Sequence, residues 1–70
     1  MTDIKRLSAI IKESGYKRTF LAKKLGLSYQ GFLNKLEGIS EFKSSEIRML
    51  CDLLSIDNPK DVQDIFLPVK

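Results

Sequence analysis

Residues 21–32 of this 70-residue chain read LAKKLGLSYQGF, and this stretch decides the fold. Its apolar residues recur at helical spacing up to Gly26, a residue that adopts a left-handed conformation without steric cost. Ser28 follows, and serine is a favoured N-cap for a new helix. Two helices joined by so short a turn must cross at a steep angle. The stretch therefore predicts a helix over residues 18–25, a turn, and a second helix over residues 29–37.

One further helix is predicted before this pair, over residues 3–14. Apolar residues in this segment recur at helical spacing, as Ile4, Leu7, Ile10 and Ile11. Thr2 stands where an N-cap is needed, and Gly15 suits the left-handed position just after the last turn. Both ends of this helix are therefore expected to be marked by local sequence signals.

Two more helices are predicted after the pair. Ser44 can cap a fourth helix with a core face at i, i+3, i+4 and i+7, made of Ile47, Leu50, Cys51 and Leu54. Asn58 as N-cap and Pro59 at the first helical position open a fifth helix that runs to about Phe66. The expected fold class is all-α, with one domain over residues 1–70 built as a compact bundle of about five short helices.

The composition argues against an enzyme, a metal site and a membrane protein. The chain has no histidine and a single cysteine, Cys51, so neither a Cys/His zinc site nor an internal disulfide is expected. It contains no glycine-rich phosphate loop and no nucleophile motif, so we expect no catalytic residue and no cofactor. No apolar run is long enough for a membrane span or a signal peptide. We therefore expect a cytoplasmic protein.

Positive charge is concentrated in the middle of the chain. Residues 17–43 hold six lysines and arginines against two glutamates, whereas residues 44–70 hold three cations against five carboxylates. A basic segment of this kind is typical of a surface that meets a polyanion such as nucleic acid. If the charge is considered by itself, the alternative is a charged surface that is simply exposed to water and binds no polyanion.

The quoted stretch resembles the helix-turn-helix of the phage repressor/Cro family, the lambda repressor-like proteins. Ala22, Gly26 and Ser28 fall at the spacing of that family, and the likeness covers about residues 3–56. The sequence is especially similar to small regulators of temperate phages and prophages of Gram-positive bacteria. The resemblance implies a sequence-specific DNA-binding regulator, such as a Cro-like repressor. It would bind double-stranded operator DNA as a homodimer, in solution or only on DNA.

The resemblance assigns base contacts to the helix over residues 29–37, namely to Tyr29, Gln30 and Asn34. Glutamine and asparagine are the side chains that bond bidentately to adenine, so an operator with adenines in each half-site is expected. The alternative is that Gln30 and Asn34 are ordinary solvated residues. Tyr29 also fits the apolar stripe of the same helix, so it is assigned equally to the core.

Phosphate contacts are expected around the start of the helix over residues 18–25. Lys17 and Arg18 are cations at a helix N-terminus, where they oppose the macrodipole. A DNA phosphate bound by the backbone N–H groups, Thr19 and these two charges would compensate, and an exposed pair screened by salt is the alternative. Further phosphate contacts are assigned to Ser28, Lys35 and Lys43.

The chain departs from the family pattern at several positions. Lys17 and Arg18 stand where the family has a polar cap and a glutamine, and Phe20 replaces a polar residue. Leu33 stands at a position expected to be exposed, and Lys35 at one expected to be buried. A recognition helix rotated or lengthened by one residue is one explanation of this exchange.

Three questions stay open at the level of the sequence. The apolar residues near the C-terminus either close the monomer core or form the dimer contact; they are Val62, Ile65, Phe66 and Leu67. Cys51 lies on a core stripe, which favours an inert thiol over a redox switch. A second function hypothesis is a small helical modulator that binds a partner repressor protein and alters its action.

Overall fold

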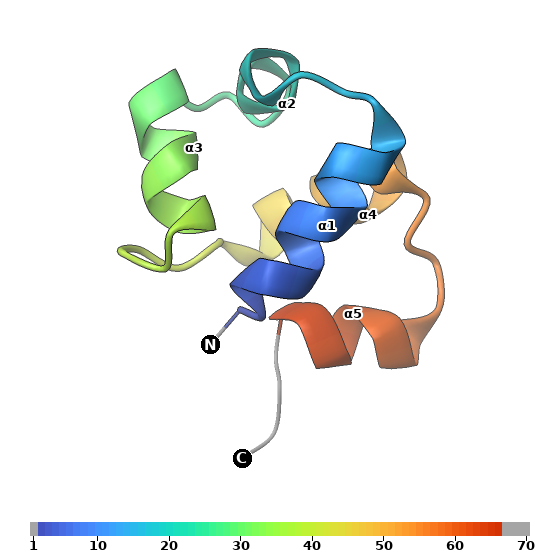
Figure 1. The fold of residues 1–70 in the computed structure, drawn as a ribbon. Coiled ribbons are helices and arrows are strands. Elements are labelled where there is room, and N and C mark those ends of the chain that lie inside the picture. The colour runs from blue at the N-terminus through green and yellow to red at the C-terminus, as the bar shows by residue number, and fades with distance from the viewer. Residues whose placement is uncertain (1, 67–70) are drawn as a thin grey trace.

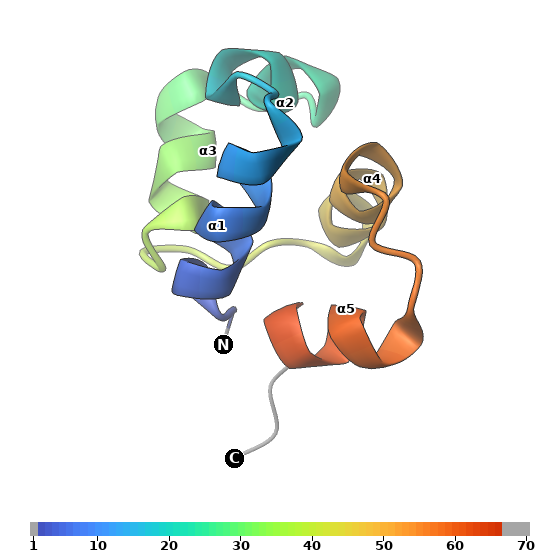
Figure 2. The ribbon, with the colours of Figure 1, turned by 45° about the vertical axis from the view of Figure 1, so that its right-hand side comes forward.

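The computed structural model describes residues 2–66, which form five helices and no strand (Figures 1 and 2). The helices are α1 (Ile4–Ser14), α2 (Arg18–Lys24), α3 (Tyr29–Leu36), α4 (Ser44–Leu54) and α5 (Pro59–Phe66). They pack into a globule of 29 × 23 × 20 Å. Among the described residues, no helix combines the length and apolar character needed to cross a membrane. The prediction of an all-α bundle of five short helices is confirmed.

The N-terminal end of α1 differs from the prediction by one residue. Asp3, not Thr2, is the N-cap: its backbone is extended, and its Oδ1 accepts a hydrogen bond of 3.1 Å from the backbone N–H of Arg6. The predicted cap at Thr2 is therefore wrong. A carboxylate is an equally good cap, and it also favours the positive end of the helix dipole. The predicted C-terminal signal is confirmed, because Gly15 has a φ of 80°.

The start of α4 also differs from the prediction, whereas that of α5 agrees with it. Lys43 is the N-cap of α4, so Ser44 is the first helical residue and the predicted Ser44 cap is wrong. The Glu46 carboxylate reaches back and accepts the backbone N–H of Lys43 at 2.8 Å, which satisfies this amide from inside the helix. At α5, Asn58 Oδ1 accepts the backbone N–H of Lys60 at 2.9 Å, as expected for an N-cap.

The core is a single cluster to which every helix contributes. Its twelve buried apolar residues are Leu7, Ile11, Leu21, Ala22, Phe32, Leu36, Phe42, Leu50, Cys51, Ile56, Ile65 and Phe66. The ring of Phe42 makes edge-on contacts with the rings of Phe32 and Phe66. Of the apolar residues near the C-terminus, Ile65 and Phe66 are each 1% exposed and Val62 packs against the cluster, so all three close the monomer core. Leu67 lies outside the described residues.

The α2 and α3 helices pack together on the side of the molecule away from α5 (Figure 1). Gly26, in the turn between them, has a φ of 71°, and Leu27 donates its backbone N–H to the carbonyl of Ala22 at 2.9 Å. The α2 and α3 helices end at Lys24 and Leu36, each one residue short of the prediction. Ala22 is buried in this corner, where a larger side chain would push the two helices apart. This corner determines how α3 is presented to solvent.

Candidate nucleic-acid interface

The start of α3 is held by a serine cap. Ser28 Oγ accepts a hydrogen bond of 3.0 Å from the backbone N–H of Gly31. A Cβ atom at residue 31 would lie 3.0 Å from the same Oγ, so glycine leaves room for the cap. The predicted N-cap role of Ser28 is confirmed, and its hydroxyl hydrogen remains able to donate to a ligand.

The α3 helix has an inner apolar face and an outer polar face. Phe32 and Leu36 are fully buried on the inner face. On the outer face, Gln30 is exposed, and its Nε2 donates a hydrogen bond of 2.9 Å to Asn34 Oδ1. Tyr29 is 47% exposed, so the structure excludes its alternative assignment to the core. The three residues predicted to contact bases therefore lie in the first two turns of α3.

Lys35 is turned into the protein, contrary to its predicted role as a phosphate contact. Its Nζ lies 2.5 Å from Glu46 Oε1, and the two side chains are only 11% and 8% exposed. An ammonium group bound to a buried carboxylate is not available to a phosphate. The pair accounts for the inner position of Lys35, while Leu33 is partly buried against the core and α3 is not lengthened, since it ends at Leu36. Lys35 keeps the inner position because Glu46 neutralises it there.

Glu46 accepts hydrogen bonds from two neighbours through one carboxylate oxygen. The donors are the Lys35 ammonium on α3 and the backbone N–H of Lys43 at the start of α4. Burial by itself would raise the pKa of Glu46, but these hydrogen bonds and the positive charges of Lys35 and Lys43 hold the pKa below its ordinary value of 4.5. Glu46 is therefore a carboxylate at neutral pH, and it ties the end of α3 to the start of α4.

The start of α2 is open to solvent. Lys17 is the N-cap but makes no side-chain cap hydrogen bond, and Arg18 and Thr19 are exposed beside it. Lys43 is also exposed, although its backbone N–H is bound by Glu46. Within residues 2–66, none of these cations takes part in an ion pair.

An aromatic stack that the sequence did not predict joins α2 to the connection that precedes this helix. The rings of Tyr16 and Phe20 lie 5.2 Å apart in a stacked arrangement, and both side chains are about two-fifths exposed. Lys24 Nζ lies 5.6 Å from the centre of the Phe20 ring, within cation–π range. The available signal was partial: Phe20 and Lys24 are one turn apart within α2, whereas Tyr16 precedes the helix.

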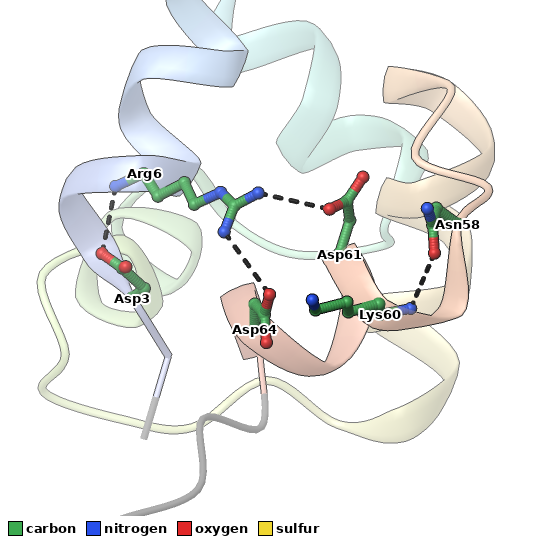
Figure 3. A network of polar contacts seen from close by, with 6 residues as sticks. All are labelled: Asp3, Arg6, Asn58, Lys60, Asp61 and Asp64. Carbon is green, nitrogen blue, oxygen red and sulfur yellow. Dashed lines mark hydrogen bonds and ion pairs between the residues drawn. The ribbon is translucent and has the colours of Figure 1, made fainter.

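Carboxylates gather at the opposite end of the molecule. Arg6 on α1 pairs with Asp61 and Asp64 on α5, at 3.3 and 3.9 Å (Figure 3). The cations of α2 and the carboxylates of α5 therefore lie on different sides of the bundle (Figure 1). Within residues 2–66, no three carboxylate or thiol groups gather as metal ligands would.

Comparison of the chain with protein-family models, with curated proteins and with solved structures found no match.

Proposed function

We propose that this protein is a sequence-specific DNA-binding regulator of transcription, of the Cro-like type found in phages and prophages. In this proposal α2 and α3 act as a helix-turn-helix, with α3 in the major groove of an operator and α2 against the backbone. Occupancy of the operator by the protein would repress transcription. The chain would act without a ligand or cofactor.

The hydrogen-bonded amides of Gln30 and Asn34 carry the proposal. Because Gln30 Nε2 donates to Asn34 Oδ1, the Gln30 Oε1 acceptor and the Asn34 Nδ2 donor remain for a ligand. Adenine presents the complementary pair in the major groove, with the N6 amino group as donor and N7 as acceptor. Two amides fixed against each other lose less conformational freedom on binding than two free ones. Tyr29 extends the same surface at the start of α3.

The charge distribution supports the same orientation on DNA. Lys17, Arg18 and Thr19 at the start of α2 are proposed to contact one phosphate, and Ser28 and Lys43 contact others along the backbone. The carboxylates of α5 lie away from this surface, so they would not repel the duplex (Figure 1). Lys35 is not among these contacts, since its charge is neutralised inside the protein.

Selection from a random DNA library tests the proposal. The purified protein should enrich a common sequence, and a gel shift should then show tighter binding to that sequence than to random DNA of equal length. The promoter region beside its own gene is the first natural candidate to search for the enriched sequence. Failure to enrich any sequence, with the protein shown to be folded, would overturn the proposal.

The Tyr16–Phe20 stack favours a second candidate function. Exposed aromatic pairs are typical of protein–protein contacts, and this one is flanked by Lys24 and Arg18. The candidate is a modulator that binds a partner repressor. It predicts that the protein changes the operator binding of that repressor while binding no DNA itself, which the same gel shift distinguishes.

A further inference from the structure

Two helix faces away from the base-contact surface expose a large apolar side chain. One is the face of Tyr16 and Phe20, which is bordered by the cations Lys12, Arg18 and Lys24. The other is the outer face of α4, where Met49 is 42% exposed. A shallow depression of about 560 Å³ lies along this second face, lined by Ser44, Ser45, Arg48, Met49 and Asp52.

The charges decide which face can meet a second copy of the chain. A two-fold interface places the same surface on both partners, so that surface must be complementary to itself. The face of Tyr16 and Phe20 is flanked by cations, and two copies of it would repel. The outer face of α4 carries one residue of each sign, Arg48 and Asp52, beside Met49. It is therefore complementary to itself in charge.

We propose that two copies of this chain associate through the outer face of α4, with the two helices antiparallel about a two-fold axis level with residue 50. This inference rests on the proposed function, because an operator with two half-sites needs two copies. The arrangement sets each Arg48 against the Asp52 of the other copy. It also brings the two Met49 side chains together beside the axis, where they supply the apolar contact. Ser45, on the same stripe, is small enough to let the helices approach.

Arg48 and Asp52 are free for this contact in the single chain. Both are exposed, and neither takes part in an ion pair among the described residues. The order of the two residues within the helix is the unfavourable one, because an acid four residues before a base pairs better than the reverse. A partner's opposite charge therefore meets no competing bond.

The last helix cannot serve in this role. The apolar residues of α5 that could have formed a dimer contact include Ile65 and Phe66, and both are buried in the core of the single chain. After Pro59, the exposed side chains of α5 are polar: Lys60, Gln63 and Asp64. A contact between single helices is smaller than the 1,200–2,000 Å² typical of stable complexes. Association through α4 is therefore weak in solution and strengthened when adjacent half-sites hold two copies side by side.

Charge reversal tests the surface without DNA. Arg48→Asp alone, or Asp52→Arg alone, turns both contacts between residues 48 and 52 of the two copies into like-charge contacts. Each variant should lower the association constant by about tenfold or more, as measured by sedimentation equilibrium. An equimolar mixture of the two variants restores both opposite-charge contacts and should associate as the unaltered chain does. Lys60→Glu, a reversal on α5, is the matched control and should change nothing. Thermal melting checks that every variant is folded.

A disulfide provides the second readout. Met49→Cys should form a covalent dimer under mild oxidation, whereas Lys60→Cys should not. Single reversals that associate normally, a mixture no stronger than its components, or equal cross-linking at both positions would each overturn the proposal. None of these results bears on the DNA proposal, which is measured by selection and gel shift. Conversely, a failure to find sequence-specific DNA binding would not change the result of the association measurements.

Discussion

Gln30 and Asn34 differ from the surrounding cations in the information that they can carry to a DNA duplex. A phosphate is the same at every base pair, so the proposed contacts of Lys17 and Arg18 would position the protein without discriminating sequence. The edge of a base differs from pair to pair, and the two amides of α3 are the groups suited to read it. Substitutions of the two kinds of side chain should therefore change different properties of DNA binding.

We expect Gln30→Ala or Asn34→Ala to weaken binding to the selected sequence by about 1–3 kcal/mol. The preference for one base pair in each half-site should relax, because the amide that reads it is gone. The salt dependence of binding should stay nearly unchanged. Fluorescence anisotropy titrations over a salt series, with single-base variants of the DNA, measure both effects. Unchanged base preference in both variants would mean that other residues read the sequence.

We expect Lys17→Ala or Arg18→Ala to weaken binding to the selected sequence and to random DNA alike. Each lost phosphate contact should reduce the slope of log K against log salt by about 0.9, since fewer counterions are released. Lys60→Ala is the control, because it removes the same charge from α5, a helix that lies away from α2 (Figure 1). A change in base preference without a change in slope would contradict the assignment of these two residues to phosphates.

Cys51 is a core residue, and its substitution should be felt as lost stability. Burial raises the pKa of its thiol, and the charge of Asp52 raises it further, so the group is a neutral and poorly reactive thiol at pH 7. Cys51→Ser should lower the free energy of unfolding by about 1–3 kcal/mol, because it buries a hydroxyl in an apolar site. Urea unfolding measures this loss. A variant of unchanged stability that loses a peroxide-dependent change in DNA binding would instead indicate a redox switch.

At the scale of the elements, the pair of Lys35 and Glu46 determines how α3 sits against α4. One charged group from each helix is buried, and each is compensated by the other and by the Lys43 backbone. Removing one partner of a buried pair costs about 3–5 kcal/mol, which is a large part of the stability of a small domain. The pair therefore favours a single orientation of α3, and with it of Gln30 and Asn34.

Acid should weaken this link between α3 and α4. The pKa of Glu46 is below its ordinary value of 4.5 in the folded protein, so the carboxylate contributes stability above that value. This contribution should be lost as the pH falls from about 4.5 through the lower pKa of the folded state. Glu46→Gln should be less stable than the unaltered chain at pH 7, and the difference should shrink in this acidic range. Urea unfolding at a series of pH values measures it.

The exposed Glu41 offers the matched control for this experiment. Glu41→Gln removes the same charge from a site without an ion pair among the described residues, and its difference from the unaltered chain should stay small at every pH. A pH-independent gap for Glu46→Gln would show that the carboxylate charge contributes nothing to stability.

At the scale of the whole molecule, α5 closes the core, and two kinds of contact hold it there. Ile65 and Phe66 are buried, while Arg6 pairs with Asp61 and Asp64 at side chains that are close to half exposed. Exposed ion pairs are screened and contribute at most about 1 kcal/mol, whereas a buried aromatic ring contributes several times more. The apolar contacts should therefore dominate the docking of α5.

We expect Phe66→Ala to lower the free energy of unfolding by about 3–5 kcal/mol and Arg6→Ala by less than about 1 kcal/mol. The small Arg6 effect should vanish at high salt, and the Phe66 effect should not. Removal of the chain from Pro59 onward deletes both buried residues of α5 and should unfold the protein. Such a truncation therefore cannot test whether α5 takes part in association between two copies. Equal losses for the two substitutions would show that the ion pairs hold α5.

The sequence alone determined the positions of the helices, because the signals that start and end them are local. Gly15 and Gly26 adopt positive φ after α1 and α2, Ser28 caps α3, and Asn58 with Pro59 opens α5, each through contacts within a few residues. The residue types at the start of α3 also identified Gln30 and Asn34 as candidates for base contacts. Their fixed geometry came from the hydrogen bond between them, which follows from helical spacing but needed the structure to be seen.

Only the tertiary structure decided which cations face solvent and which apolar residues remain outside the core. Lys35 is bound by Glu46, eleven residues along the chain and on another helix, and no local pattern reveals such a partner. The same holds for Phe66, whose ring meets Phe42 across the core. Both outcomes depend on how whole helices pack, since burial and charge pairing are properties of residues that are distant in sequence and adjacent in space.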